Sequence, residues 1–504
     1  MRDLPDPVAW PVDHLAERGR GGDLALVMRG KAFDWNDLRA RVGELAAWLA
    51  ARVPQRGARV ASWLAKGEMA CFLPLAAARA GLVYVPINPL LKRAQVTHIG
   101  ADSACSLLIA TPSRLNTLEP GDLPENCEAI GEDAALEEAR AMGLSLPPSQ
   151  ADSGELAALL YTSGSTGRPK GVMLSHANLW LGAVSVAHYL GMARDDVTLA
   201  VLPLSFDYGQ NQLLSTWYAG GSVAPLDYLT PRDVIKAVAR HGVTTLAAVP
   251  PLWVQLVEQD WPADAVAPLR RLTNSGGALT VDLVRTLRSK FPQAKLFPMY
   301  GLTEAFRSTY LDPSLTDSHP TSIGKAIPFA EVLVIGDDGE PATPGEEGEL
   351  VHCGPLVAQG YWNDPERTAE RFRPAPPSSR YGGTAVWSGD RVRQDADGLL
   401  YFAGRRDAMI KSAGNRISPQ EIEDAAIASG LASEAVALGV PDERLGQAIR
   451  LIVRGSGDED GLRAALKREL PNFMQPGAIV WVDHMPTNPN GKIDRAALLK
   501  KVTS

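Results

Sequence analysis

Apolar and polar residues alternate along the first part of the chain in the rhythm of an α/β protein. Residues 38–53, LRARVGELAAWLAARV, repeat apolar positions with a helical period, and short apolar runs occupy 58–64 and 81–87. Helices that alternate with apolar strands predict a parallel sheet covered by helices. The rhythm returns in four apolar runs that end in glycine, proline or small polar residues, at 196–204, 243–251, 269–277 and 294–301. Ligand-contacting loops are expected at these strand ends.

The pattern changes after about residue 328. Residues 330–362 are short apolar runs joined by Gly, Asp and Pro turns, which predicts an antiparallel β subdomain over about 328–403. From Tyr401 a smaller α/β pattern begins, in which Ser418 is expected as a helix N-cap and Pro419 as the first helical residue. The predicted boundary lies near Asp407 and separates a large domain, 1–403, from a small α/β domain, 404–504.

Length and composition narrow the class of protein. A chain of 504 residues exceeds the roughly 250–300 residues at which one hydrophobic core stops growing, so several structural units are expected. Apolar residues make up 45% and charged residues 21%, which is the balance of a globular protein. The net charge of -8 argues against binding to nucleic-acid phosphates, and no nucleic-acid partner is expected.

Three features favour a cytoplasmic protein. The N-terminal residues hold acids and prolines where a secretory signal has a basic start and an apolar run. The most apolar stretch, residues 72–91, is interrupted by arginine, glycine and proline, so no membrane span is expected. The cysteines lack CxxC spacing, which favours a reduced chain without a cysteine-bound metal. They are Cys71, Cys105, Cys127 and Cys353.

The segment with the clearest chemistry is Tyr161 to Gly171, YTSGSTGRPKG. Glycines let backbone N–H groups approach an oxyanion closely, hydroxyl side chains donate further hydrogen bonds, and a lysine adds positive charge. The lysine is preceded by proline and followed by glycine, so this is not a Walker A loop. The residues predicted to bind phosphate are Thr162, Ser163, Gly164, Ser165, Thr166, Gly167 and Lys170.

Ordered motifs over nearly the whole chain resemble one family. Besides YTSGSTGRPKG they are NSGGA at 274, MYGLTEA at 299, GELVHCGPLVAQGYW at 348, WSGD at 387, GRRDAMIKSAGNRISPQEIE at 404 and PTNPNGKIDR at 486. The chain resembles the adenylate-forming superfamily of acyl-CoA synthetases, amino-acid adenylation domains of peptide synthetases and beetle luciferases. Its segments GLTEAFRSTY and SIGKAIP are similar to bacterial acyl-CoA ligases associated with exosortase-linked polysaccharide gene clusters.

The resemblance implies a site for ATP and Mg²⁺. Tyr300 would lie against adenine, and Thr303 would hydrogen-bond a phosphate. Glu304 would hold Mg²⁺, a cation that prefers carboxylate and phosphate oxygens. Asp390 would accept the ribose hydroxyls, and Arg405 would lie close to the ribose and phosphates. The remaining residues assigned to ATP by resemblance are Gly276, Gly277 and Ala278, which form the other adenine wall, and Gly301.

The resemblance also implies two successive reactions. Lys492 would stabilise charge while a carboxylate attacks the α-phosphate and pyrophosphate leaves. No protein base is needed, because the carboxylate is ionised at neutral pH. The C-terminal domain would then rotate about Asp407 and present a face for the thiol of CoA or of a carrier protein's phosphopantetheine. Its residues are Lys411, Gly414 and Arg416.

The acid-binding segment, LPLSFDYGQNQ at 202–212, departs from common fatty-acid and aryl-acid ligases. Phe206 stands where those enzymes carry histidine, and Phe206-Asp207 resembles amino-acid adenylation domains, in which the aspartate binds an ammonium group. Alternatively, Asp207 pairs with Arg307, which is also expected to line the acid pocket. A short, polar or amino-bearing acid is favoured over a long-chain fatty acid. The other residues expected to line the acid pocket are Tyr208, Asn211, Ser275 and Met299.

Two classes of function remain open at this point. The first is a thiol ligase that makes an acyl-CoA or loads a carrier protein. The second is an enzyme that stops at the adenylate or passes the acyl group to a non-thiol acceptor such as an amine. Release of AMP that depends on a thiol would separate the two.

Overall fold

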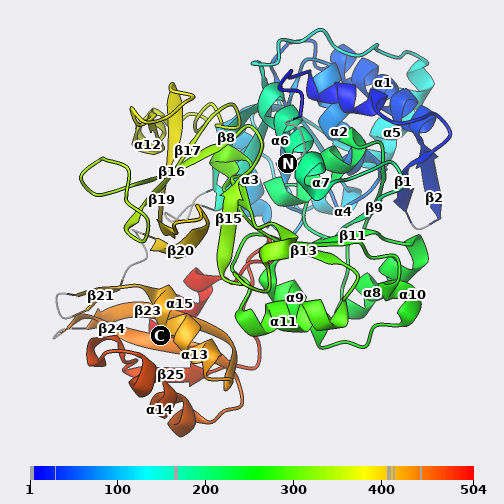
Figure 1. Cartoon of the computed structure of the whole chain (residues 1–504). Helices are drawn as coiled ribbons and strands as arrows, with labels where there is room; N and C mark the ends of the chain where they lie inside the picture. The colour runs from blue at the N-terminus through cyan, green and yellow to red at the C-terminus, as the bar shows by residue number, and fades with distance from the viewer. Residues whose placement is uncertain are drawn as a thin grey trace.

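The computed structural model describes residues 5–28, 30–163, 169–405, 410–412, 415–442 and 445–503, and within them the chain forms three sheets. Figure 1 shows a large N-terminal part, coloured blue to yellow, with a smaller C-terminal part, coloured orange to red, beside it. Both parts mix helices and strands, so the expected α/β class is confirmed. Among the described residues, none of the helices has the length and apolar character needed to cross a membrane.

The largest sheet has a parallel centre and an antiparallel extension. In spatial order, neighbouring strands of this sheet are β16 (Glu331–Ile335), β17 (Glu347–Cys353), β19 (Thr384–Gln394), β20 (Leu400–Arg405), β15 (Ser322–Ala326), β14 (Thr309–Tyr310), β13 (Lys295–Tyr300), β12 (Arg271–Asn274), β11 (Thr245–Ala248), β9 (Val197–Ala200), β10 (Ser222–Pro225), β1 (Leu24–Met28) and β2 (Lys31–Asp34). One further strand, β18 (Phe372–Pro374), pairs with β19. Strands β10, β9, β11, β12 and β13 are parallel. The antiparallel segment predicted at 328–403 continues this sheet, because β20 pairs with β15.

The two smaller sheets lie in different parts of the chain. The N-terminal one has the order β6 (Glu128–Gly131), β5 (Cys105–Ala110), β3 (Arg59–Trp63), β4 (Val83–Ile87), β7 (Leu156–Ser163) and β8 (Pro169–Ser175). The C-terminal one has the order β22 (Asn415–Ile417), β21 (Ile410–Ser412), β24 (Gly446–Gly455) and β23 (Ala432–Asp442), with β25 (Ala478–Trp481) on β24. The C-terminal sheet has its own buried core, built from residues between 410 and 479.

The helices begin where the sequence supplies caps. Asp34 and Asp37 hydrogen-bond each other's backbone at the start of α1, and Ser175 and Asn178 do so at α6. The longer helices are α1 (Trp35–Arg52), α2 (Glu68–Arg79), α3 (Arg93–Ser103), α5 (Glu132–Met142), α6 (His176–Leu190), α7 (Asp207–Tyr218), α8 (Pro231–His241), α9 (Pro250–Val257), α11 (Val281–Lys290), α13 (Pro419–Ala428), α14 (Glu459–Glu469) and α15 (Arg495–Thr503). The shorter ones are α4 (Pro112–Leu115), α10 (Ala263–Val266) and α12 (Pro365–Arg371).

One expected cap has a different role. Helix α13 begins at Pro419, directly after Ser418, as predicted, but the Ser418 side chain does not bond the helix. Its hydroxyl donates to the backbone oxygen of Ala403 at 2.7 Å. Ser418 therefore fastens the start of α13 to the end of the antiparallel sheet. The predicted boundary residue, Asp407, lies outside the described residues.

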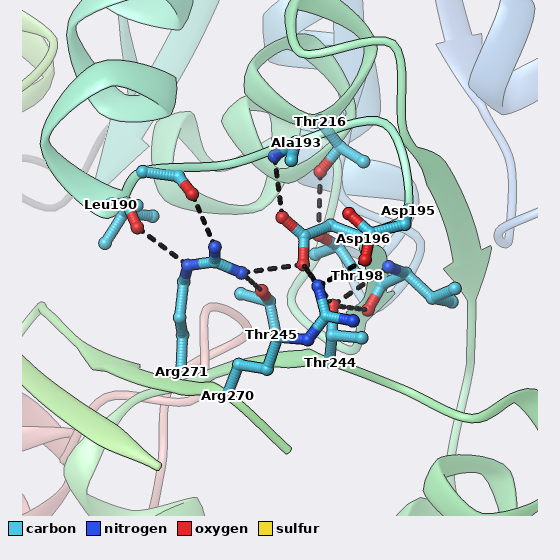
Figure 2. Close-up of polar contacts among 12 residues, drawn as sticks. Leu190, Ala193, Asp195, Asp196, Thr198, Thr216, Thr244, Thr245, Arg270 and Arg271 are labelled. Atoms are coloured by element: carbon cyan, nitrogen blue, oxygen red, sulfur yellow. Dashed lines mark hydrogen bonds and ion pairs between the residues drawn. The ribbon is translucent and has the colours of Figure 1, made fainter. Parts of the chain in front are cut away.

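A buried ion-pair network fixes the amino-terminal ends of the central parallel strands (Figure 2). Asp196, fully buried before β9, accepts hydrogen bonds from Arg271 Nη1 at 2.7 Å and from Thr244 Oγ1 at 2.8 Å. Arg271 also donates to the backbone oxygens of Leu190 and Gly191 at the end of α6. The network joins the start of β12 and the residue before β9 to the end of α6. Its charges are paired and hydrogen-bonded, as buried charges must be.

Candidate active site

A cavity of about 420 Å³ opens at the carboxyl ends of β12 and β13 and is closed on one side by the C-terminal part. Ligands of open α/β sheets bind at this edge. The cavity brings together predicted residues from six separate motifs of the sequence. Those that line it are Thr162, Lys170, Phe206, Asp207, Gly276, Gly277, Ala278, Met299, Tyr300, Gly301, Thr303, Glu304, Asp390 and Lys492.

Lys492 enters this cavity from a turn of the C-terminal part. Asn488 closes the turn, because its backbone N–H donates to Lys492 O at 2.7 Å and its side-chain oxygen accepts from Lys492 N at 3.1 Å. Lys492 Nζ lies 4.7 Å from the centre of the Phe206 ring. Gly276 has a φ of +83°, and a Cβ there would lie 2.7 Å from Lys492 Cε. The glycine thus makes room for the lysine beside the residues expected to bind the acid.

The nucleoside end of the cavity is defined by Tyr300 and Asp390. The Tyr300 phenol donates to Asp390 Oδ2 at 2.5 Å. Asp390 lies on β19 directly opposite Arg405 on β20, which places the Arg405 backbone next to the cavity. A carboxylate beside an aromatic ring is suited to a ribose and a base, because the carboxylate accepts two hydroxyl protons.

The phosphate end is defined by charged side chains around Tyr361. The Tyr361 phenol donates to Glu304 Oε1 at 2.6 Å, and Lys170 Nζ lies 3.9 Å from the centre of the Tyr361 ring. Burial lowers the pKa of Lys170, the Glu304 charge raises it, and the charges of Arg371 and Arg367 lower it. Burial, with the Glu304 charge, raises the pKa of Tyr361, so the phenol stays a donor. Glu304 is suited to a hard cation such as Mg²⁺.

The phosphate loop joins two strands at this end. Thr162 and Ser163 end β7, Lys170 lies on β8, and the Thr162 and Lys170 backbones are opposite each other. This pairing holds the two ends of the predicted phosphate loop together in the wall of the cavity. The other predicted loop residues lie outside the described residues; they are Gly164, Ser165, Thr166 and Gly167.

Arg371 is a site residue that the sequence reasoning missed. It ends α12, lines the cavity at the phosphate end, and donates to the backbone oxygen of Trp387 at 3.1 Å. Arg371 belongs to no glycine-rich or acidic motif, so only the folded arrangement could reveal it. Other lining residues that were not predicted are Gln420, Asn488 and Asn490, from the C-terminal part.

Asp207 occupies the end expected to bind the acid. It is the first residue of α7 and is only 4% exposed. The Thr303 hydroxyl donates to Asp207 Oδ1 at 3.1 Å, and Arg307 Nη2 lies 3.8 Å from Asp207 Oδ2. The structure therefore contains the internal pairing of Asp207 with Arg307 that the sequence left as one alternative.

Four residues predicted to line the acid pocket do not line this cavity: Tyr208, Asn211, Ser275 and Arg307. Ser275 instead accepts a hydrogen bond from Arg307 Nη1 at 3.3 Å. The other three border a separate cavity of about 20 Å³, and Met299 borders both cavities. Asn211 lies one helical turn after Asp207 on α7, so the two residues are about 5 Å apart along the helix axis. The residues expected to line one acid pocket therefore border two separate cavities, and Met299 lies between these cavities.

Two residues of the predicted thiolation face lie in the C-terminal sheet. Lys411 on β21 and Arg416 on β22 are opposite each other in a hairpin of the C-terminal sheet. The predicted Gly414 and hinge residue Asp407 lie outside the described residues. The Lys492 turn lines the active-site cavity, which is the arrangement expected for the first reaction.

A second cavity of about 420 Å³ lies on the other side of the Lys492 turn. Asn488, Asn490 and Ser205 border both cavities. The second cavity runs between the residues after β4 and the start of α9. The turn that carries Lys492 therefore forms part of the wall between the two spaces.

Comparisons with known proteins decide the family. The model of the AMP-binding enzyme family matches residues 13–362, and the model of the AMP-binding enzyme C-terminal domain matches residues 421–492. The chain belongs to the AMP-binding enzyme family. The two matches include five of the six lining motifs described above, from the phosphate loop to Lys492. The lining residues Arg371, Asp390 and Gln420 lie between the two matched ranges.

Relatives of this AMP-binding enzyme act on different acids. It is 33% identical to a feruloyl-CoA synthase of Amycolatopsis, over 96% of both chains. It is 30% identical to an L-proline–[L-prolyl-carrier protein] ligase of Pseudomonas fluorescens, over 95% of this chain and 96% of the ligase. It is also 32% identical to a probable non-canonical nonribosomal peptide synthetase, CymA, of Salinispora arenicola, of whose length it spans 6%. ATP-bound MatB of Rhodopseudomonas palustris superposes with a TM-score of 0.88 at 27% identity, over 99% of both chains.

These relatives identify the reaction class. The chain is an AMP-forming acid–thiol ligase of the acyl-CoA synthetase type. Such enzymes use ATP, Mg²⁺, and CoA or a carrier-protein phosphopantetheine. The acids named for the relatives differ from one another, so the acid must be argued from the pocket of this chain.

Proposed function

We propose that the 420 Å³ cavity adenylates a short, polar or amino-bearing carboxylic acid and that the acyl group then passes to the thiol of CoA or a carrier protein. The observation that carries the proposal is the position of Lys492, which lines the cavity beside Phe206 and Gly276. A cation there is placed to stabilise charge that develops at the α-phosphate.

Each end of the cavity has a distinct role in this proposal. Asp390 and Tyr300 bind the nucleoside, Lys170 and Arg371 bind the phosphates, and Glu304 holds Mg²⁺. The metal neutralises phosphate charge when it is bound. The protein supplies no nucleophile, so its contribution is to position the two substrates and stabilise charge.

The second cavity supplies a route for the thiol. A phosphopantetheine arm is long and thin, and the space between the residues after β4 and the start of α9 reaches the wall formed by the Lys492 turn. If the turn withdraws with the C-terminal part, this space meets the adenylate. The hairpin with Lys411 and Arg416 would then replace the turn.

The test follows pyrophosphate release across fatty, aryl, hydroxy and amino acids, and AMP release with and without CoA or a carrier protein. We expect a short polar acid to be preferred and AMP release to require a thiol. AMP release without any thiol would favour the alternative, an enzyme that passes its adenylate to a non-thiol acceptor. A preference for long-chain fatty acids would contradict the proposed acid class.

The role of Lys492 has its own test. Lys492→Ala should reduce adenylate formation by at least 100-fold, because an oriented charge at a developing oxyanion is worth about 3–4 kcal/mol. Thioester formation from a supplied acyl-adenylate should be nearly unchanged. Lys500→Ala, on the C-terminal helix and outside the cavity, is the control. Equal loss of both reactions in Lys492→Ala would refute the division of roles.

A further inference from the structure

The ion pair between Asp207 and Arg307 is incomplete. Asp207 Oδ2 and Arg307 Nη2 are 3.8 Å apart, which is too long for a hydrogen bond, and their side chains are 4% and 2% exposed. Among the described residues, Arg307 Nε and Nη2 have no hydrogen-bond partner. A buried donor without a partner costs about 1–3 kcal/mol, so these nitrogens require an explanation.

The surroundings of Arg307 hold it in place and add more polar atoms. The guanidinium lies 4.6 Å from the centre of the Tyr208 ring, and Nη1 donates to Ser275 Oγ. Among the described residues, Asn211 Oδ1 and both amide atoms of Gln212 also lack hydrogen-bond partners. All of these residues except Ser275 border the 20 Å³ cavity, which has room for one water or one small polar group.

Met299 separates this small polar space from the active-site cavity. It borders both, and its sulfur accepts a hydrogen bond from Tyr189 at 2.8 Å. Methionine is unbranched and adapts to its neighbours, so a change of rotamer would join the two spaces. The polar group of an acid bound beside Asp207 would then reach Arg307 as well.

The two charges restrict what that group can be. An ammonium would donate to Asp207 but would be repelled by Arg307, and a second carboxylate would accept from Arg307 but would be repelled by Asp207. A neutral group that donates and accepts satisfies both partners. We propose that the acid carries such a group, a hydroxyl, bound between Asp207 and Arg307. This proposal rests on the proposed function, in which the cavity beside Asp207 binds the acid.

The experiment compares acids of nearly equal size. Pyrophosphate release is measured with propanoate and with its 2- and 3-substituted forms that carry a hydroxyl, an ammonium or a second carboxylate. We expect the best hydroxy acid to have a kcat/KM at least about tenfold above its three counterparts. If propanoate, an amino acid or a dicarboxylate is preferred and AMP release still needs a thiol, the proposed function stands and this inference fails.

Two variants test the charge argument directly. Arg307→Met should move the preference toward the ammonium acid, and Asp207→Asn should move it toward the dicarboxylate. Each variant leaves a buried charge unpaired and is prone to misfold. The double variant Asp207→Asn with Arg307→Gln has neither charge, and it should fold. Its kcat/KM for the hydroxy acid relative to the other acids should be about tenfold lower than in the wild type. Retention of the wild-type ranking in the double variant would overturn the inference.

Discussion

Asn88 and Asn490 are joined by a hydrogen bond from the Asn88 side-chain nitrogen to the Asn490 side-chain oxygen at 3.2 Å. The same nitrogen donates to the backbone oxygen of Pro489 at 3.0 Å. Asn88 follows β4 in the N-terminal part and is 6% exposed. One buried amide thus holds the turn that carries Lys492 against the active-site cavity.

Asn88→Ala should weaken the adenylating arrangement selectively. Two lost hydrogen bonds of about 1 kcal/mol each predict a roughly 5- to 30-fold slower adenylation. Thioester formation from a supplied acyl-adenylate should be unchanged or faster, because that step needs the turn to leave. Glu258→Gln, which removes the half-exposed ion pair with Arg454, is a control expected to change either step less than about fivefold. Parallel losses in both steps for Asn88→Ala would contradict the prediction.

Arg371→Gln tests the phosphate end of the cavity. A charge-assisted hydrogen bond is worth about 1.5–3 kcal/mol, so kcat/KM for ATP should fall about 10- to 150-fold. The Km for the acid should change little, and Arg371→Lys should recover part of the loss. Arg373→Gln is the matched control, because Arg373 lies outside this cavity and stacks 3.9 Å from the Trp387 ring centre. Equal effects of the two substitutions would rule out a specific role for Arg371.

The lowered pKa of Lys170 predicts a pH dependence. A lysine loses its charge as pH rises through its pKa, so phosphate binding should weaken at a lower pH than an ordinary lysine, with a pKa of about 10.4, would allow. Lys170→Arg keeps its charge to higher pH, because a guanidinium has a pKa above 12. The alkaline fall in kcat/KM for ATP should therefore move to higher pH in Lys170→Arg. If kcat/KM for ATP falls at the same high pH in Lys170→Arg as in the wild type, another group is responsible for the fall.

The Asp196 network predicts a large effect on stability. Asp196→Ala leaves Arg271 buried without its carboxylate, and removal of one partner of a buried pair costs about 3–5 kcal/mol. Urea unfolding should show this as a lower midpoint. Asp195→Ala, next to it but 65% exposed, should cost less than about 1 kcal/mol. A small effect of Asp196→Ala would mean that hydrogen bonds to Thr244 and the backbone do not depend on the charge pair.

Patterns local in sequence predicted much of this molecule. The apolar runs at 243–251 and 269–277 became β11 and β12, and the residues that follow β12 line the active-site cavity. Such runs are informative because a buried parallel strand is apolar on both faces. The glycine- and hydroxyl-rich loop likewise identified Thr162 and Lys170, which do line the cavity.

The missed and misplaced residues depend on packing between distant segments. Arg371 reaches the phosphate end because α12 packs next to β19, and nothing in its own neighbourhood of sequence indicates this. Tyr208, which follows Asp207, is expected in the acid pocket. Successive helical residues point about 100° apart, and Tyr208 turns away to hydrogen-bond Thr273 at 2.6 Å. Asp207 and Tyr208 are adjacent in the sequence but line different cavities.

Strand β12 is only four residues long, yet it has Arg271 of the buried network at its first position and Asn274 of the active-site cavity at its last. The buried anchor of the sheet and the wall of the active site thus lie at opposite ends of the same short segment. A lineage can therefore change the cavity wall after Asn274 while the anchor at Arg271 keeps the sheet intact. The same separation lets a protein engineer vary the cavity wall and leave the buried anchor untouched.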